Sequence, residues 1–138
     1  ALCRKIIEAK INKKAEIDVW GDGEQTRSFL FIDDCLNGTF DLFKSDYHEP
    51  LNIGSEEQVS INQMISIIEE IASYKVRKNY QLDKPLGVRG RSSDNRLVNK
   101  KLDWSPKLNL KQGLELTYSW IYDQINSGTN INKFTNSY

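Results

Sequence analysis

The sequence predicts a small α/β domain in which helices pack on a small mixed sheet. Apolar residues recur with helical spacing in four separate segments, at residues 2–7, 36–43, 61–71 and 114–125. Short alternating or apolar runs bounded by glycine and proline lie between them, which is typical of strands. The resulting order is helix, β-hairpin, helix, strand, helix, strand, helix, helix, and it fits neither a helical bundle nor a sandwich. The length of 138 residues suits one domain with a modest core.

The first 32 residues predict a helix followed by a β-hairpin. The segment "ALCRKIIEAK" carries Leu2, Ile6 and Ile7 on one helical face. The segment "AEIDVW" alternates as a strand and runs into "GDG" at residues 21–23. We interpret these glycines as a hairpin turn and not as a phosphate loop, because the P-loop and dinucleotide fingerprints are absent. The run "SFLFI" then predicts a second, well-buried strand.

A helix and a short strand are expected next. Asp33 and Asp34 follow the apolar run, and either carboxylate can cap the next helix. Acid–base chemistry by this pair is the alternative, but capping explains it more simply. Leu36, Phe40 and Phe43 repeat with helical spacing, so we expect them in the core. The segment "PLNIGS" predicts a short strand that ends in a glycine turn.

The second half of the chain predicts three more helices and an edge strand. Ser60 is a strong N-cap for the helix that follows, and Asp94 can cap a short helix that ends at Leu102. The charged segment "KVRKNY" between them predicts an edge strand. The apolar face of the helix after Ser60 consists of Ile61, Met64, Ile65, Ile68 and Ile71. The face of the last helix consists of Leu114, Tyr118, Ile121 and Ile125, and we also expect Trp20, Trp104 and Trp120 in the core.

The composition excludes several classes of function. Nineteen basic and nineteen acidic side chains balance, so no overall field favours nucleic acid or an anionic membrane. The single histidine, His48, lies in a polar turn and argues against a zinc site or a histidine-based triad. Cys3 and Cys35 have no nearby cysteine partner, which indicates free thiols in a reducing, cytoplasmic setting. Because the net charge is zero, any site for an anion must be formed by a local group of basic side chains.

Two arginines are the candidates for such a site. Arg27 ends the polar run "QTR" just before an apolar segment, and Arg91 lies in "GVRGR" beside a glycine that lets a ligand approach the backbone. A guanidinium fork matches two phosphate oxygens, so two arginines could clamp a pyrophosphate. Taken separately, a surface arginine flanking a strand and a flexible basic loop explain these residues equally well or better.

The strings "WGDGEQTRSFLFIDDCLNG", "EPLNIGSEEQVSINQM", "GVRGRSSDN" and "KLDWSPKLNLKQGLELTYSWI" resemble, in this order, the C-terminal part of extended short-chain dehydrogenase/reductases, the NAD-dependent epimerase/dehydratase family. The resemblance implies that residues 1–125 form a nucleotide-sugar-binding domain of a Rossmann-type enzyme and that 126–138 are a disordered polar tail. It also implies that NAD and all catalytic residues belong to an N-terminal Rossmann domain that precedes residue 1. A chain without that domain should expose apolar surface.

The same resemblance implies a set of substrate-binding residues: Lys5, Gln25, Thr26, Arg27 and Arg91. They would hold the diphosphate and nucleotide of a GDP-sugar. The implied activity of a full-length homodimer is oxidation of GDP-mannose at C4, epimerisation at C3 and C5, and re-reduction at C4. Another sugar-nucleotide dehydratase or decarboxylase of the family, and a non-catalytic nucleotide-sugar-binding module, are the alternatives.

Overall fold

A computed structural model describes residues 1–85 and 87–127 of the chain. The elements in chain order are α1 (Leu2–Ile11), β1 (Glu16–Trp20), β2 (Thr26–Ser28), α2 (Ile32–Lys44), β3 (Gln58–Ser60), α3 (Ile61–Ala72), β4 (Arg77–Gln81), β5 (Gly90–Arg91), α4 (Arg96–Leu102) and α5 (Leu110–Asn126). The α/β class is confirmed. Of the predicted tail at 126–138, residues 128–138 lie outside the described part.

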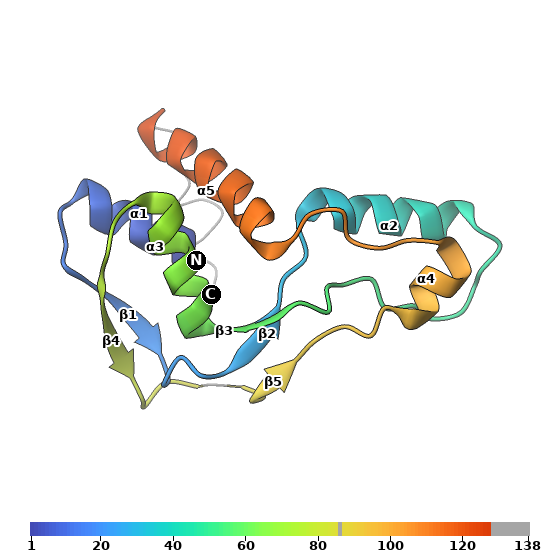
Figure 1. Ribbon diagram of the computed structural model, residues 1–138, viewed down its shortest axis with the longest axis horizontal. Helices are drawn as coiled ribbons and strands as arrows, with labels where there is room; N and C mark the ends of the chain where they lie inside the picture. The colour runs from blue at the N-terminus through green and yellow to red at the C-terminus, as the bar shows by residue number, and fades with distance from the viewer. Residues whose placement is uncertain (86, 128–138) are drawn as a thin grey trace.

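The strands form two small sheets along one side of an elongated molecule (Figure 1). β1 pairs in parallel with β4, and β2 lies between β3, which is antiparallel to it, and β5, which is parallel to it. The predicted hairpin is therefore wrong, because β1 and β2 belong to different sheets. The strand predicted at "SFLFI" is also wrong, since β2 ends at Ser28 and residues 29–31 have no strand pairing.

The core lies where α1, α3 and α5 pack against one another and β1 packs against α1; the three helices are seen in Figure 1. Ile6, Ile7, Ile65 and Ile68 have no exposed surface, and each such side chain contributes about 1.5–3 kcal/mol by its burial. The periodicities predicted for these helices are confirmed. The buried members of the cluster are Cys3, Ile6, Ile7, Ala9, Ile17, Val19, Ile65, Ile68, Ala72, Leu110, Leu114 and Tyr118.

The two best-defined helix starts use the same device. The Ser60 Oγ accepts a hydrogen bond from the Gln63 backbone N–H at 3.1 Å, and the Gln63 Oε1 accepts one from the Ser60 N–H at 2.8 Å. Asn109 and Gln112 form the equivalent capping box at the start of α5. Each box satisfies two backbone donors that a helix start would otherwise leave without partners.

Helix α2 differs from its predicted environment. Its predicted core stripe is exposed, at 59% for Leu36, 54% for Phe40 and 83% for Phe43. The spacing did predict a helix with one apolar face, but no described element covers that face. Ile32, at the start of α2, is exposed on the same helix, so this apolar stripe runs along its length. Trp20 and Trp120 are exposed as well, and of the three tryptophans only Trp104 is buried.

The opposite face of α2 packs against the segment around α4. A methyl group on Gly38 would lie 2.7 Å from the Trp104 ring and 2.8 Å from Ile53, so the helix approaches both closely. The Asp34 Oδ2 accepts hydrogen bonds from the backbone N–H groups of Lys107 and Leu108, both at 3.1 Å. The predicted capping of α2 by an aspartate is thus wrong: Asp34 instead fixes the loop before α5, and α2 has no side-chain cap.

The three remaining strand and capping predictions have different outcomes. Residues 50–55 do not form a strand, and the neighbouring strand is β3, three residues further on. A methyl group on Gly54 would lie 2.5 Å from the Ser93 Cβ, so this segment serves as a close contact for the loop before α4. The edge strand at β4 is confirmed. The predicted cap of α4 by Asp94 is wrong: the N-cap is Asn95, and α4 has no side-chain cap, although the Asp94 Oδ1 accepts a hydrogen bond from the Arg96 N–H at 3.1 Å.

Replacing Ser60 by alanine should lower the free energy of unfolding by about 0.5–2 kcal/mol, because the Gln63 N–H loses its acceptor. Thermal or urea unfolding followed by circular dichroism would measure the change. Ser66→Ala is the matched control, since this serine lies inside α3 and its hydroxyl returns to the Asn62 carbonyl within the helix. Equal destabilisation by the two variants would contradict the capping role.

Replacing Leu36, Phe40 and Phe43 together by glutamine should reduce self-association of the 138-residue chain. Burial of one large apolar side chain contributes about 1.5–3 kcal/mol, so removing three should weaken association by more than about tenfold. Sedimentation velocity over a range of concentrations would measure the association constant. A control carries glutamine at three scattered exposed positions: Leu82, Val88 and Leu97. The same shift in the control would show that the α2 stripe has no special role.

Candidate functional site

The structure brings Arg27 and Arg91 together at the edge of the three-stranded sheet. They are direct partners in the parallel register between β2 and β5. Partners in adjacent parallel strands present their side chains on the same face, with the strands about 4.8 Å apart. Two guanidinium groups therefore start from neighbouring backbone positions. The sequence could name both arginines, but only the sheet register makes them neighbours.

The Arg27 side chain lies beside the glycine loop. Its Nη1 donates a hydrogen bond to the Thr26 carbonyl at 2.6 Å, and its Nη2 lies 3.6 Å from the position a Cβ would take on Gly87. Gly87 has a φ of +66°, which a side chain would disfavour. Arg91 is exposed. Such an arrangement offers two cationic forks to one anion on the solvent side of the sheet.

The turn that precedes β2 is clamped to α3 by Asn62. The Asn62 Nδ2 donates to the Asp22 carbonyl at 3.1 Å, and its backbone N–H donates to the Gly23 carbonyl at 2.9 Å. Gly23 has a φ of +74°, and a Cβ there would lie 2.4 Å from the Asn62 Oδ1. That Oδ1 also accepts a hydrogen bond from the Tyr80 hydroxyl at 2.9 Å. Sequence reasoning missed Asn62, because nothing in the helical pattern marks its contact with a turn some forty residues earlier.

A second contact joins this turn to the strand that carries Arg91. The Asp22 Oδ2 accepts a hydrogen bond from the Arg89 Nη1 at 3.0 Å, while its Oδ1 accepts one from the Glu24 N–H at 2.9 Å. The Glu24 N–H, together with Arg89, holds the pKa of the Asp22 carboxyl below its usual range. Asp22 is therefore anionic at neutral pH.

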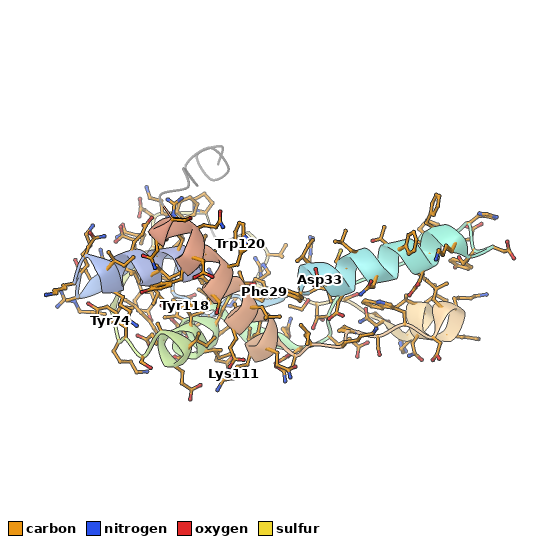
Figure 2. All side chains as sticks on the ribbon, turned by 90° about the horizontal axis from the view of Figure 1, so that it is seen from above. Phe29, Asp33, Tyr74, Lys111, Tyr118 and Trp120 are labelled. Atoms are coloured by element: carbon orange, nitrogen blue, oxygen red, sulfur yellow. The ribbon has the colours of Figure 1, made fainter. Side chains whose placement is uncertain are left out.

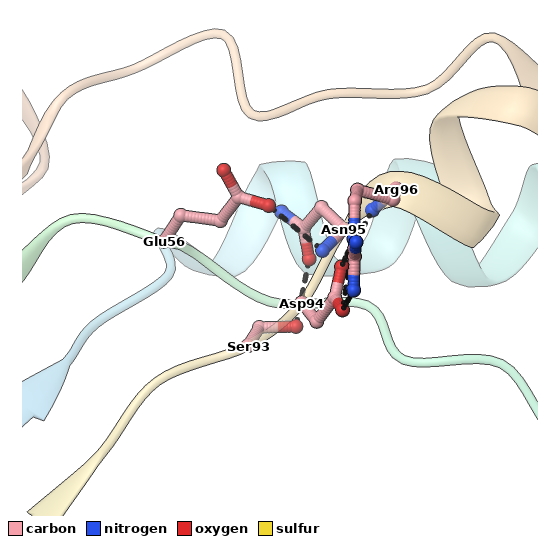
Figure 3. A network of polar contacts seen from close by, with 5 residues as sticks. All are labelled: Glu56, Ser93, Asp94, Asn95 and Arg96. Atoms are coloured by element: carbon pink, nitrogen blue, oxygen red, sulfur yellow. Dashed lines mark hydrogen bonds and ion pairs between the residues drawn. The ribbon is translucent and has the colours of Figure 1, made fainter.

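The loop after Arg91 is anchored by Asn95, a buried residue that sequence reasoning also missed (Figure 3). Its backbone N–H donates to Glu56 at 2.9 Å, its Nδ2 donates to the Gly54 carbonyl at 2.7 Å, and its Oδ1 accepts from the Ser93 hydroxyl at 2.7 Å. Both polar atoms of the side-chain amide therefore have a hydrogen-bond partner. These bonds fix the chain that leaves β5.

The exposed pair formed by Asp94 and Arg96 lies next to this anchor (Figure 3). The Arg96 Nη2 is 2.6 Å from the Asp94 Oδ2. Hydrogen bonds from the Arg96 side chain, and then from its backbone N–H, lower the pKa of Asp94 to about 2, and the carboxylate in turn raises the pKa of Arg96. Because the two residues are only two positions apart, the pair is local.

The other predicted site residues are placed differently from the arginine pair. Gln25 is only 8% exposed; its Nε2 donates to the Trp20 carbonyl at 3.1 Å and its Oε1 has no hydrogen-bond partner within the described residues. Thr26 faces the opposite side of the sheet from Arg27, toward Gly90. The Lys5 Nζ donates to the Asp18 carbonyl of β1 at 2.8 Å, in the other sheet.

One hollow of the described part is chemically different from the arginine pair. It is an apolar groove of about 620 Å³ between α1, the segment after β2, and α5. Phe29 and Trp120, which are labelled in Figure 2, belong to its lining, and no arginine or lysine does. The groove therefore suits apolar contacts and not a diphosphate. Ile32 belongs both to this groove and to the exposed stripe of α2, so the two form one apolar surface.

Neither a metal cluster nor a membrane span is found in the described residues. No group of three or more His, Cys, Asp or Glu side chains is arranged to hold a metal ion in residues 1–85 and 87–127. Within the same ranges, each helix is too short or too polar to cross a bilayer.

The fold and the arrangement of its strands are those of the C-terminal part of Rossmann-type sugar-nucleotide epimerases and dehydratases, within the extended short-chain dehydrogenase/reductase class. UDP-glucuronic acid 4-epimerase from Bacillus cereus, in a complex with UDP-glucuronic acid and NAD, superposes with a TM-score of 0.79 at 32% identity, over 89% of this chain and 40% of that one. UDP-glucose 4-epimerase from Thermotoga maritima gives 0.81 at 25% identity, over 90% and 38%. The profile of the GDP-mannose 4,6 dehydratase family matches residues 1–117, and the chain belongs to that family.

Curated relatives narrow the similarity further. GDP-mannose 3,5-epimerase from Arabidopsis thaliana is 46% identical over 125 residues, which are 91% of this chain and 32% of the relative. GDP-L-fucose synthase 1 from the same plant is 34% identical over 121 residues, or 87% and 37%. The chain thus spans about a third of the length of the curated relatives it matches.

The carboxylates of Asp22 and Asp94, each paired with its own arginine, should titrate independently of each other. The Asp94 carboxyl should show a midpoint near pH 2 in a carbon-detected NMR titration, and Arg96→Gln should raise it. Because the pKa is lowered in the folded chain, the stabilising effect of the pair is present above the unfolded value of about 3.9 and is lost as pH falls through about 2. Arg89→Gln should raise the pKa of Asp22 and leave Asp94 unchanged. If either variant changed the pKa of both carboxyls, the two pairs would not be independent.

Proposed function

We propose that this chain is the substrate-binding part of an NAD-dependent sugar-nucleotide epimerase whose substrate is GDP-mannose. The observation that carries the proposal is the pairing of Arg27 with Arg91 across β2 and β5. The similarity to GDP-mannose 3,5-epimerases supports the choice of nucleotide and sugar. The activity assigned to the whole protein is oxidation at C4, epimerisation at C3 and C5, and re-reduction at C4.

The role of this chain is to hold the diphosphate. Each guanidinium can donate two parallel hydrogen bonds to phosphate oxygens, and a fixed anchor for the diphosphate determines where the sugar ring lies. Gln25 and Thr26, which precede Arg27 directly, and Lys5 on α1 complete the proposed binding set. Ligand contacts by Lys5 and Gln25 require their side chains to turn from the Asp18 and Trp20 carbonyls. Arg27 would likewise turn its Nη1 from the Thr26 carbonyl, and Thr26 faces the opposite side of the sheet from Arg27.

The residues present do not fit NAD. The sequence contains no glycine-rich dinucleotide fingerprint between a strand and a helix, and no arginine or lysine of the described residues lines the apolar groove. The proposal therefore assigns NAD and the catalytic groups to an N-terminal domain of a longer protein. The continuous apolar surface of α2 and the groove is the surface on which that domain packs. The proposed assembly is a homodimer in the cytoplasm, which sedimentation and fractionation would test.

Another enzyme of the same family is the second candidate. The matching profile describes GDP-mannose 4,6 dehydratases, and a relative named GDP-L-fucose synthase is 34% identical. A diphosphate clamp serves any of these reactions, so this site does not separate them. A non-catalytic nucleotide-sugar-binding module is the third candidate. In that case the full-length protein would bind GDP-mannose without converting it.

The test of the reaction uses the full-length protein with NAD and GDP-mannose in deuterated water. Mass spectrometry should find deuterium at C3 and C5 of the sugar without loss of water, because epimerisation exchanges those protons and dehydration removes an oxygen. Loss of water would move the assignment to a dehydratase. Binding with neither outcome would leave the binding module as the explanation.

The test of the clamp compares arginine variants in the full-length protein. Arg27→Ala and Arg91→Ala should each weaken GDP-mannose binding by about tenfold to a hundredfold, since each removes one charge-assisted fork. Arg27→Lys should recover only part of the affinity, because an ammonium cannot donate in the fork geometry. Arg77→Ala is the control: this exposed arginine pairs with Glu16 in the two-stranded sheet. Unchanged calorimetric affinity in both arginine variants would rule out the clamp.

A further inference from the structure

The strand that carries Arg91 is too short to determine its own register. β5 consists of two residues, Gly90 and Arg91, and pairs only with β2. A shift of one residue along β2 would turn the Arg91 side chain to the opposite face of the sheet. Contacts outside the strand must therefore fix the register. The structure shows one set of contacts on each side of β5.

On the N-terminal side, Arg89 is held at two points by the segment that leads into β2. Its carbonyl accepts a hydrogen bond from the Thr26 N–H at 2.9 Å, and its Nη1 donates to the Asp22 Oδ2 at 3.0 Å. The carbonyl contact alone would continue an ordinary ladder. The side-chain contact adds a specific partner, because in this arrangement Asp22 meets Arg89 and no other arginine.

Asp22 is itself fixed to the rest of the fold. Its Oδ1 accepts from the Glu24 N–H, so both carboxylate oxygens are engaged. Its carbonyl accepts from Asn62 on α3, and the glycines on either side both have a φ of +74°. The carboxylate thus projects from a turn of defined shape that is bound to a core helix.

The steric fit opposite Thr26 supports the same register. A Cβ on Gly90 would lie 2.9 Å from the Thr26 Oγ1, so the observed pairing places a glycine where a side chain would be crowded. On the C-terminal side of β5, the Ser93 N–H donates a hydrogen bond to the Ser55 carbonyl at 3.2 Å, and the Asn95 N–H donates one to the Glu56 Oε1 at 2.9 Å. Arg91 therefore lies between two anchors, of which the Asp22–Arg89 pair is the ionic one.

We propose that Asp22 is a positioning residue of the diphosphate site: its carboxylate, through Arg89, fixes β5 on β2 so that Arg91 lies beside Arg27. This inference rests on the proposed function, because it gives Asp22 a role in binding only if the two arginines bind the substrate. Asp22 does not touch the ligand in this account. The pair is exposed, at 41% for the aspartate and 68% for the arginine side chain, so its effect should appear in binding more than in overall stability.

The test measures GDP and GMP affinities of the full-length protein by calorimetry at fixed ionic strength. Asp22→Asn keeps an oxygen for the Glu24 N–H and replaces the oxygen that faces Arg89 by an amide donor. We expect GDP affinity to fall by about tenfold, in the range of couplings within one polar network, and GMP affinity to change less. With GDP-mannose, KM should rise while kcat is kept, since the chemical groups are not touched.

A double variant separates positioning from a general effect. In the Arg91→Ala background, Asp22→Asn should cause no further loss of GDP affinity, because the residue it positions is gone. Arg89→Gln removes the same pair from the other side and leaves the turn intact, so it should reproduce the loss and replaces Asp22→Asn if that variant does not fold. Asp94→Asn is the matched control: it is an exposed carboxylate paired with an arginine in the same loop, but it contacts neither β2 nor β5.

The outcomes distinguish this inference from the proposed function. If Arg91→Ala weakens GDP binding but Asp22→Asn and Arg89→Gln do not, the positioning role is wrong and the clamp remains. A loss from Asp22→Asn that adds in full to that of Arg91→Ala, or an equal loss from Asp94→Asn, would also overturn the positioning role. If neither Arg27→Ala nor Arg91→Ala changes GDP affinity, the proposed function is wrong, and the positioning role of Asp22 is wrong with it.

Discussion

The contact between Asn62 and the turn at residues 21–23 is the constraint on which the proposed site depends. Asn62 lies in the first turn of α3, a helix whose isoleucines form the centre of the core. Its hydrogen bonds to the Asp22 and Gly23 carbonyls determine where the chain leaves β1 and enters β2. Because a Cβ on Gly23 would overlap the Asn62 side chain, the turn can approach the helix this closely only with glycine. These contacts therefore fix the start of β2, the strand that carries Arg27, to a core helix.

The paired arginines and the exposed apolar side chains lie on different surfaces of the molecule. The small sheets lie along one side, and α2 and α5 lie along the other (Figure 1). The sheet side presents the two paired arginines, whereas the helix side presents the groove and the exposed stripe of α2. Solvent exposure of several large apolar side chains in one continuous surface is typical of an interface. The proposed diphosphate site on one surface and the proposed interface on another would suit a domain that holds a substrate for chemistry performed elsewhere.

Helices were predicted better than strands, and the reason is physical. The hydrogen bonds of a helix are local, so the isoleucine spacing of α3 and the Ser60 cap were sufficient to predict it. A strand pairs with residues far away in the sequence, and the segments around β1 and β2 look like a hairpin until their real partners, β4 and β3, are known. The stripe on α2 shows a related limit: periodicity predicts an apolar face, but does not say whether this part of the chain covers it.

The sequence by itself determined the α/β class, the helices, the Ser60 cap and the two arginines of the proposed site. These follow from local spacing and from side-chain chemistry, which do not depend on distant residues. Only the tertiary structure decided that Arg27 and Arg91 are neighbours, that Asp22 meets Arg89, and that Asp34 binds the loop before α5 instead of capping its own helix. Each of these contacts joins segments that are more than sixty residues apart, and their geometry exists only after the sheet register and the packing of α2 and α3 are established.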